Sequence, residues 1–156
     1  MDANATDLDA RSIVTTRLID APRDLVFAAL SDPKHLANWW GPDGFSTTTS
    51  AFAFRIGGVW RFVMHGPDGR DYENRITYEE IVAPERIVYA HGGDAGGEPV
   101  SFRTTVTFAD EGGKTRLTMH AVFPTSAERE RVAREYGAVE GAQQTVARLA
   151  AYLKTL

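Results

Sequence analysis

The sequence predicts one α+β domain, in which a curved antiparallel sheet of seven strands grips a long C-terminal helix above an apolar cavity. Between residues 45 and 123, short segments rich in β-branched and aromatic residues alternate with turns that contain glycine or proline. This pattern is typical of an antiparallel meander. After residue 124, apolar residues recur at steps of three and four, which is typical of one face of a helix.

The region before the meander predicts one strand and two short helices. Ile13 to Ile19 is rich in β-branched residues and predicts the first strand. Pro22 opens a short helix, and Asp32-Pro33 supplies the N-cap and first residue of a second one. We expect the acidic, polar residues 1–11 to be a flexible segment and residues 12–156 to form the domain.

Six further strands complete the predicted sheet. The sequences Gly-Pro-Asp-Gly, Gly-Gly and Glu-Gly-Gly between them favour reversals of the chain. The expected strands are Phe45–Phe54, Val59–His65, Asp71–Val82, Ile87–His91, Val100–Phe108 and Lys114–Phe123. The glycine-rich stretch Gly92–Gly97 is not followed by the helix that a phosphate-binding loop needs, so it predicts a mobile loop at the cavity mouth.

A helix is expected from Thr125 to the C-terminal end of the sequence. Thr125-Ser126-Ala127-Glu128 is a capping box, and an apolar stripe follows from Val132 to Leu153. Gly137 weakens the middle of this helix, and the sequence leaves open whether the helix is broken there. A helix lying across the concave face of the sheet would leave a cavity lined by alternate strand residues.

Composition excludes several classes of function. The formal charge of −4 and the scattered Lys and Arg residues argue against a nucleic-acid partner. There is no cysteine, and the four histidines lack ligand spacing, so we expect neither metal nor cofactor. The longest apolar run, Leu25–Leu30, is too short to insert into a membrane, and no signal peptide is recognisable. A cytoplasmic protein is expected.

Strand alternation and the helical stripe define candidate ligand-binding residues. The inward strand faces contribute Trp60, Phe62, Met64, Tyr72, Asn74, Tyr78, Tyr89, His91, Phe102 and Met119. Trp40 is expected at the cavity entrance, and the helix contributes Tyr136, Val139, Ala142 and Gln143. The competing interpretation is that these residues only fill the core. The polar residues among them favour a pocket, because a dry core would leave those groups without partners.

Six short motifs occur in an order that resembles one known family. They are Asp20-Ala21-Pro22, Trp39-Trp40-Gly41-Pro42, Gly57-Gly58-Val59-Trp60, residues 80–87, residues 112–118 and Glu140-Gly141. In this order they resemble the bacterial single-domain branch of the Activator of heat-shock protein 90 ATPase homologue family. The resemblance spans the chain from about residue 12 to its end. It implies the START-like, or Bet v 1-like (SRPBCC), superfamily with the helix-grip fold.

The resemblance implies an internal cavity that binds lipids, polyketides or aromatic molecules. Our leading hypothesis is therefore binding of a small apolar ligand, in a cavity of roughly 300–1,000 Å³. The family usually has Trp after the last Glu-Gly, whereas this sequence has Ala142, which predicts a larger cavity.

Two alternatives stay open. The first is a cyclase- or dehydratase-type enzyme with His91, Tyr72 or Tyr89 as proton donors and acceptors, and a perturbed polar pair in the cavity would favour it. The second is a chaperone-associated module, which an exposed apolar patch on the outer sheet face would favour. The absence of a separate N-terminal chaperone-binding domain argues against that module. A homodimer is not excluded.

Overall fold

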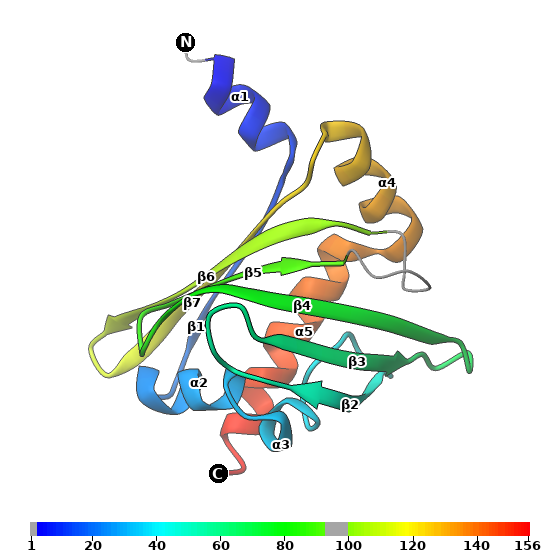
Figure 1. Ribbon diagram of the computed structural model, residues 1–156. Helices are drawn as coiled ribbons and strands as arrows, with labels where there is room; N and C mark the ends of the chain where they lie inside the picture. Colours follow the sequence, from blue (N-terminus) through cyan, green and yellow to red (C-terminus); the bar gives the residue numbers. More distant parts are fainter. Residues whose placement is uncertain (1–2, 93–99) are drawn as a thin grey trace.

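The computed structural model describes residues 3–92 and 100–156. The sheet within this part has seven antiparallel strands in the order β1-β7-β6-β5-β4-β3-β2 (Figure 1), which confirms the predicted α+β fold. The strands are β1 (Ser12–Ile19), β2 (Ser46–Phe52), β3 (Val59–His65), β4 (Asp71–Val82), β5 (Arg86–His91), β6 (Phe102–Glu111) and β7 (Lys114–Val122). Most of the glycine-rich loop predicted at the cavity mouth lies outside the described residues.

The first strand closes the meander at one edge. Every residue of β1 from Ser12 to Ile19 is paired with β7 in antiparallel register. The first strand in the sequence is therefore an edge strand of the sheet, next to the last one. Two register shifts, at Thr49/Ala51 in β2 and at Tyr78/Glu80 in β4, insert extra residues into their strands. Such bulges increase local twist and bending, and they help the sheet to curve around the helix.

The structure contains the two short helices that the sequence predicts after the first strand. The helices among the described residues are α1 (Ala3–Ala10), α2 (Arg23–Leu30), α3 (Pro33–Leu36), α4 (Ser126–Tyr136) and α5 (Ala138–Leu153). Asp32 caps α3 as predicted, because its Oδ1 accepts a hydrogen bond from the backbone N of Lys34 at 2.8 Å.

Helix α1 was not expected, since the sequence predicted a flexible segment there. Two residues that follow the helix, Arg11 and Ser12, contact its last turn. The Arg11 guanidinium pairs with Asp7 at 2.9 Å, and the Ser12 hydroxyl donates to the backbone oxygen of Leu8 at 2.6 Å. These contacts explain why regular structure extends into the acidic segment.

The C-terminal helix is interrupted at Gly137, the position that the sequence left open. Gly137 has φ 60° and ψ 39°, a left-handed conformation that glycine adopts without a Cβ penalty. It ends α4, and α5 starts at the next residue. The N-cap prediction is confirmed, because the Thr125 hydroxyl accepts from the backbone N of Glu128 at 3.1 Å.

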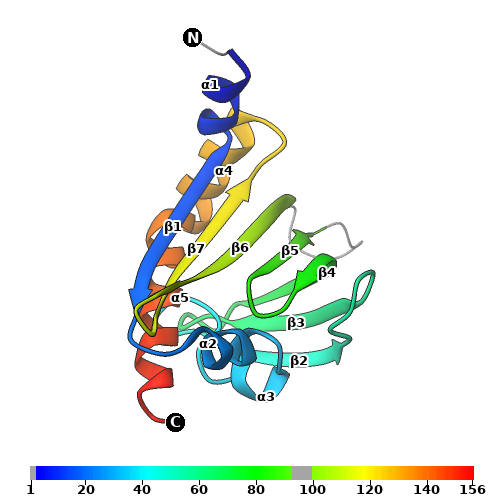
Figure 2. The same ribbon diagram turned by 90° about the vertical axis from the view of Figure 1, so that its left-hand side faces the viewer.

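Helices cover the two ends of α5 unequally. Helices α2 and α3 lie near the C-terminal end of α5, and α4 lies at the other end (Figures 1 and 2). Accordingly, the buried apolar residues form two separate clusters. The larger cluster joins α2, α3, α5 and the sheet, and the smaller one consists of Ile13, Phe123 and Val132 with partly buried neighbours.

Candidate functional site

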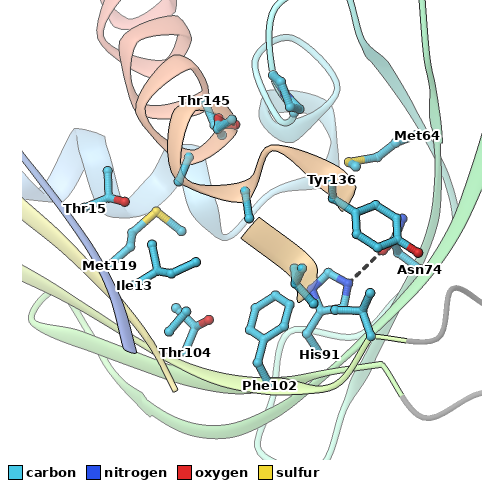
Figure 3. A pocket seen from close by; sticks show the side chains of 18 of the residues that line it. Ile13, Thr15, Met64, Asn74, His91, Phe102, Thr104, Met119, Tyr136 and Thr145 are labelled. Carbon is cyan, nitrogen blue, oxygen red and sulfur yellow. Dashed lines mark hydrogen bonds between the residues drawn. The ribbon is translucent and has the colours of Figure 1, made fainter. Parts of the chain in front are cut away.

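A cavity of about 230 Å³ lies between the concave side of the sheet and helices α4 and α5 (Figure 3). Its volume falls below the range of roughly 300–1,000 Å³ expected from the sequence. The described residues of its wall are Ile13, Thr15, Trp40, Gly41, Pro42, Met64, Tyr72, Asn74, Tyr89, His91, Val100, Phe102, Thr104, Met119, Ala121, Phe123, Val132, Tyr136, Ala138, Gly141, Ala142 and Thr145.

Strand alternation and the helical stripe place most of the candidate residues on this wall. The candidates that line the cavity are Trp40, Met64, Tyr72, Asn74, Tyr89, His91, Phe102, Met119, Tyr136 and Ala142. They come from seven different elements and one loop, and the curvature of the sheet brings them together. Their role in ligand binding remains a prediction.

Three aromatic candidates lie on the predicted face but not in the cavity wall. Trp60, Phe62 and Tyr78 are 1%, 2% and 3% exposed and belong to the larger cluster. The Trp40 ring packs 5.0 Å from that of Trp60, and the Phe54 ring packs 4.9 Å from that of Tyr78. The face was predicted correctly, but this part of it is filled by Trp40, Phe54 and the short helices.

The two remaining candidates, Val139 and Gln143, do not line the cavity either. Both are on α5, where Gln143 is exposed and Val139 packs against the smaller cluster. Gly137 ends α4, so the spacing of three and four does not continue from Tyr136 into α5 as in one helix. The wall residues of α5 are Ala138, Gly141, Ala142 and Thr145, a stripe that includes Ala142 but neither Val139 nor Gln143.

Several residues of the cavity wall are not among the candidates predicted from the sequence. Ile13 and Thr15 alternate on β1 with exposed neighbours, so the period-two rule would have found them. Gly41 and Pro42 carry no such signal. Arg148 Nη1 donates to their backbone oxygens at 2.8 and 2.9 Å, and this contact with a distant helix places the loop against the cavity.

Asn74 and His91 form a polar pair in the cavity wall. His91 Nε2 lies 2.7 Å from Asn74 Oδ1 (Figure 3). Asn74 Nδ2 donates to the backbone oxygen of Tyr72 at 2.9 Å. The residues are on neighbouring strands, and Asn74 is two positions from Ile76, the residue opposite His91. The sequence named both residues, but only the register brings them within hydrogen-bond distance.

Burial favours the uncharged form of both titratable candidates of β5. It lowers the pKa of His91 from 6.5 to about 4, because the apolar surroundings disfavour the imidazolium. It raises the pKa of Tyr89 to about 12. The neighbouring Thr104 hydroxyl lowers the pKa of Tyr89 and so opposes part of this effect, although no described group lies in hydrogen-bond geometry with Thr104 Oγ1.

A second hydrogen-bonded histidine lies on the outer face of the sheet. His65 Nδ1 is 2.7 Å from Asp71 Oδ1, and His65 Nε2 is 2.9 Å from Thr48 Oγ1. The order hydroxyl, imidazole, carboxylate is that of a catalytic triad. However, all three residues face away from the cavity wall, so this row links β2, β3 and β4 without bordering a binding site.

No group of three or more His, Cys, Asp or Glu side chains among the described residues could hold a metal ion. No helix in that part of the chain is long and apolar enough to cross a membrane.

Solved structures with the same fold cover nearly the whole chain. A protein from Arthrobacter aurescens is 28% identical with a TM-score of 0.87, over 96% of this chain and 90% of that chain. A protein from Chromobacterium violaceum is 28% identical with a TM-score of 0.79, over 92% and 97% of the two chains. DynU16, from the dynemicin biosynthetic locus, is 20% identical with a TM-score of 0.67, over 93% of this chain and 48% of that chain. The likeness to DynU16 shows the fold alone.

Comparison at the level of sequence gives the family. A search of the curated proteins found no match. The sequence model described as Activator of Hsp90 ATPase homolog 1-like protein matches residues 20–154, which agrees with the resemblance in the short motifs. The chain therefore belongs to the Activator of Hsp90 ATPase homolog 1-like family.

Proposed function

We propose that the protein binds a small, uncharged and largely apolar molecule in the cavity between the sheet and helices α4 and α5. The composition of the wall carries this proposal, because its described residues are apolar, aromatic or neutral polar, with no Lys, Arg, Asp or Glu. Apolar surface moved from water into such a site contributes favourably to binding. A charged ligand would be buried there without a counter-ion, which is costly.

The volume narrows the ligand class. A cavity of about 150 Å³ is known to hold benzene, so 230 Å³ suits a molecule of one or two rings. A long acyl chain does not fit within that volume. Of the lipid, aromatic and polyketide-like ligands that the family resemblance implies, ring-sized aromatic molecules are favoured.

The enzyme alternative rests on the Asn74–His91 pair, and the structure supplies part of what it needs. The pair lies in the cavity at hydrogen-bond distance and its histidine has a perturbed pKa. The direction of the shift argues against catalysis, because a general acid or base works best with a pKa near the operating pH. The pKa of Tyr89 is raised to about 12, so it too lies farther from neutral pH than the ordinary value. Binding without turnover is therefore the better-supported function.

The chaperone-associated alternative needs a contiguous apolar patch on the outside of the sheet. Among the described strand residues, the large exposed apolar side chains are Val14 and Leu18 on β1 and Val82 at the end of β4. Three strands separate β1 from β4 in the sheet order. These side chains are too dispersed to support a docking surface.

Titration calorimetry with indane and decanoate tests the proposal. Indane is a neutral two-ring hydrocarbon of suitable size, and we expect it to bind with a stoichiometry of one. Decanoate is anionic and extended, and we expect no binding. Trp40 lines the cavity whereas Trp39 and Trp60 are 0% and 1% exposed, so indane should change tryptophan emission less in Trp40→Phe. Failure of indane to bind, or equal binding of decanoate, would refute the proposal.

A further inference from the structure

The hydrogen bonds of His91 fix which of its ring nitrogens carries the proton. Asn74 Nδ2 donates to the backbone oxygen of Tyr72, which directs the amide oxygen toward His91 Nε2. An amide oxygen can only accept, so Nε2 must be the protonated nitrogen. Since burial keeps His91 neutral at physiological pH, its Nδ1 has no proton and can only accept a hydrogen bond.

This acceptor is available to a molecule in the cavity. His91 lines the cavity, and no described residue donates to its Nδ1. The residue is only partly buried, so the described part of the chain leaves some of its surface open. The Phe102 ring packs against the imidazole, with centroids 4.6 Å apart and an interplanar angle of 31°. That contact covers a face of the ring and favours approach of a ligand along its edge.

The other polar side chains of the wall do not distinguish as sharply between ligands with a hydrogen-bond donor and ligands without one. Hydroxyls, such as that of Thr15, can donate or accept by rotation. The Thr145 hydroxyl donates to the backbone oxygen of Gly141 at 2.8 Å, so it can accept from a ligand, and rotation away from Gly141 lets it donate instead. Asn74 Nδ2 has a second hydrogen that could meet an acceptor on a ligand. A requirement for a donor on the ligand therefore depends on His91.

We propose that His91 selects neutral one- or two-ring ligands that present an N–H or O–H group, and that Asn74 acts as a positioning residue by fixing the histidine tautomer. The inference rests on the proposed function, since it assigns a ligand class to the same cavity. A ligand without a donor would bury Nδ1 unpaired and lose the hydrogen bond as well. A phenol, an indole-type amine or an aryl alcohol can donate to Nδ1, whereas an ether or a hydrocarbon of the same shape leaves Nδ1 unpaired and is expected to bind more weakly.

Three bicyclic probes of nearly the same shape test the selectivity. Indole carries an N–H, benzofuran has an acceptor oxygen in its place, and indene has neither. By calorimetry at pH 7.5 we expect indole to bind about tenfold more tightly than benzofuran and indene, the effect of one buried hydrogen bond. Equal binding of the three probes would overturn the inference alone. No binding of any probe would overturn both the inference and the proposed function.

Two histidine variants separate a specific contact from a general effect. His91→Phe should reduce the indole-to-benzofuran ratio to about one, while benzofuran binding is retained because the ring still fills its place. His65→Phe is the matched control, because His65 is hydrogen-bonded on the outer face, and the ratio should not change. A ratio that persists in His91→Phe, or that falls equally in His65→Phe, would contradict the assignment.

The positioning role of Asn74 has a readout that does not need a ligand. In protein labelled with ¹⁵N-histidine, the ring-nitrogen shifts of His91 should show a protonated Nε2 and an unprotonated Nδ1. Asn74→Leu should give a mixture of both tautomers and lower the indole-to-benzofuran ratio, because a protonated Nδ1 can no longer accept. A single Nε2–H tautomer that persists in Asn74→Leu would remove Asn74 from the proposal.

Discussion

The two apolar clusters of this protein differ in how completely they are packed. In the larger cluster, Trp39, Val106 and Leu149 have no exposed surface, and the Trp39 indole donates to the backbone oxygen of Ala29 at 3.1 Å. In the smaller cluster, Ile13, Phe123 and Val132 are all part of the cavity wall. One end of the domain is therefore tightly packed, whereas the other end leaves a cavity unfilled.

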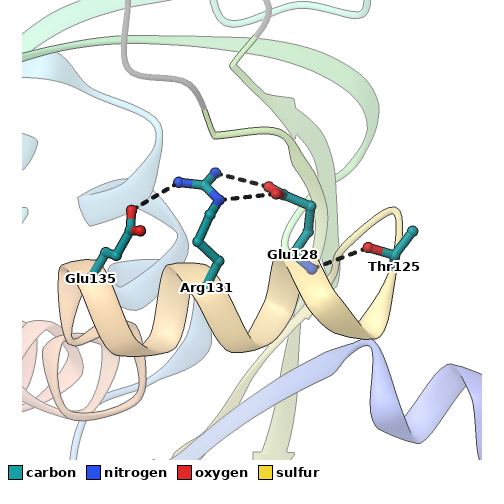
Figure 4. A network of polar contacts seen from close by, with 4 residues as sticks. All are labelled: Thr125, Glu128, Arg131 and Glu135. Atoms are coloured by element: carbon teal, nitrogen blue, oxygen red, sulfur yellow. Dashed lines mark hydrogen bonds and ion pairs between the residues drawn. The ribbon is translucent and has the colours of Figure 1, made fainter.

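The difference follows from the helices that cover each end. Helix α2 contributes Val26, Phe27, Ala29 and Leu30 to the buried core, whereas α4 contributes only Val132. On its exposed side α4 carries a row of charges, in which Arg131 binds Glu128 at 2.8 Å and Glu135 at 3.0 Å (Figure 4). A helix with one buried side chain cannot fill the space beneath it, so the cavity remains open at this end.

The largest expected loss of stability follows from truncating two phenylalanines, one in each cluster, that are equally buried. Phe108 and Phe123 are each 2% exposed, but only Phe123 lines the cavity. Phe108→Ala should cost about 3–5 kcal/mol of unfolding free energy. Phe123→Ala should cost at least about 1 kcal/mol less, because the ring already lacks packing partners on its cavity side. Denaturant unfolding measures the free energy lost in each variant. Equal losses would show that the two clusters are packed equally well.

The cavity end should also respond to pH through His91. Its pKa is lowered from 6.5 to about 4 in the folded state, so the unfolded chain binds more protons between these values. Stability should therefore fall as the pH decreases from 6.5 toward 4 and be insensitive to His91 above 6.5. The total effect is on the order of 3 kcal/mol.

Unfolding of the wild type and His91→Phe at a series of pH values measures this contribution. The variant should show a flatter pH dependence in the window from 6.5 to 4. Parallel curves for the two proteins would show that His91 is not desolvated in the folded state.

A larger side chain at position 142 shows whether the space beside Ala142 is open. It lines the cavity, whereas Gln143 beside it is exposed and does not fill the space. Ala142→Trp should fold with a cost below the roughly 1–3 kcal/mol of an overpacked core, and it should abolish binding of indane. Gln143→Trp is the control and should leave indane binding unchanged. A full overpacking cost without loss of binding would show that Ala142 only adjusts packing.

The smallest effect is expected at the charged surface of α4. Exposed ion pairs contribute little to stability because water and salt screen them. We expect Arg131→Gln to leave the thermal midpoint within the scatter of repeated measurements, with or without added salt. Val132→Ala, on the same helix but buried, should lower it clearly. A larger effect at Arg131 would show that surface charges, and not the small cluster, hold α4 in place.

The helices, the strands and the inward faces of the strands can largely be predicted from local sequence patterns. Period-two segments between turn sequences predicted the seven strands, and the caps at Asp32 and Thr125 were identified from local patterns. The inward positions of Tyr89, His91 and Met119 followed from alternation. These predictions succeeded because helix and strand periodicity, capping and turn chemistry depend on residues that are close in the chain.

How far the cavity extends along each strand depends on contacts between elements that are distant in the chain. Trp60 and Met64 share a face of β3, yet Trp60 is packed against Trp40 and Met64 borders the cavity. The loop at Gly41 reaches the wall through Arg148, and Asn74 meets His91 through the register of β4 and β5. A cavity is the space that distant elements leave unfilled, so its position depends on long-range packing that periodicity within one strand does not encode.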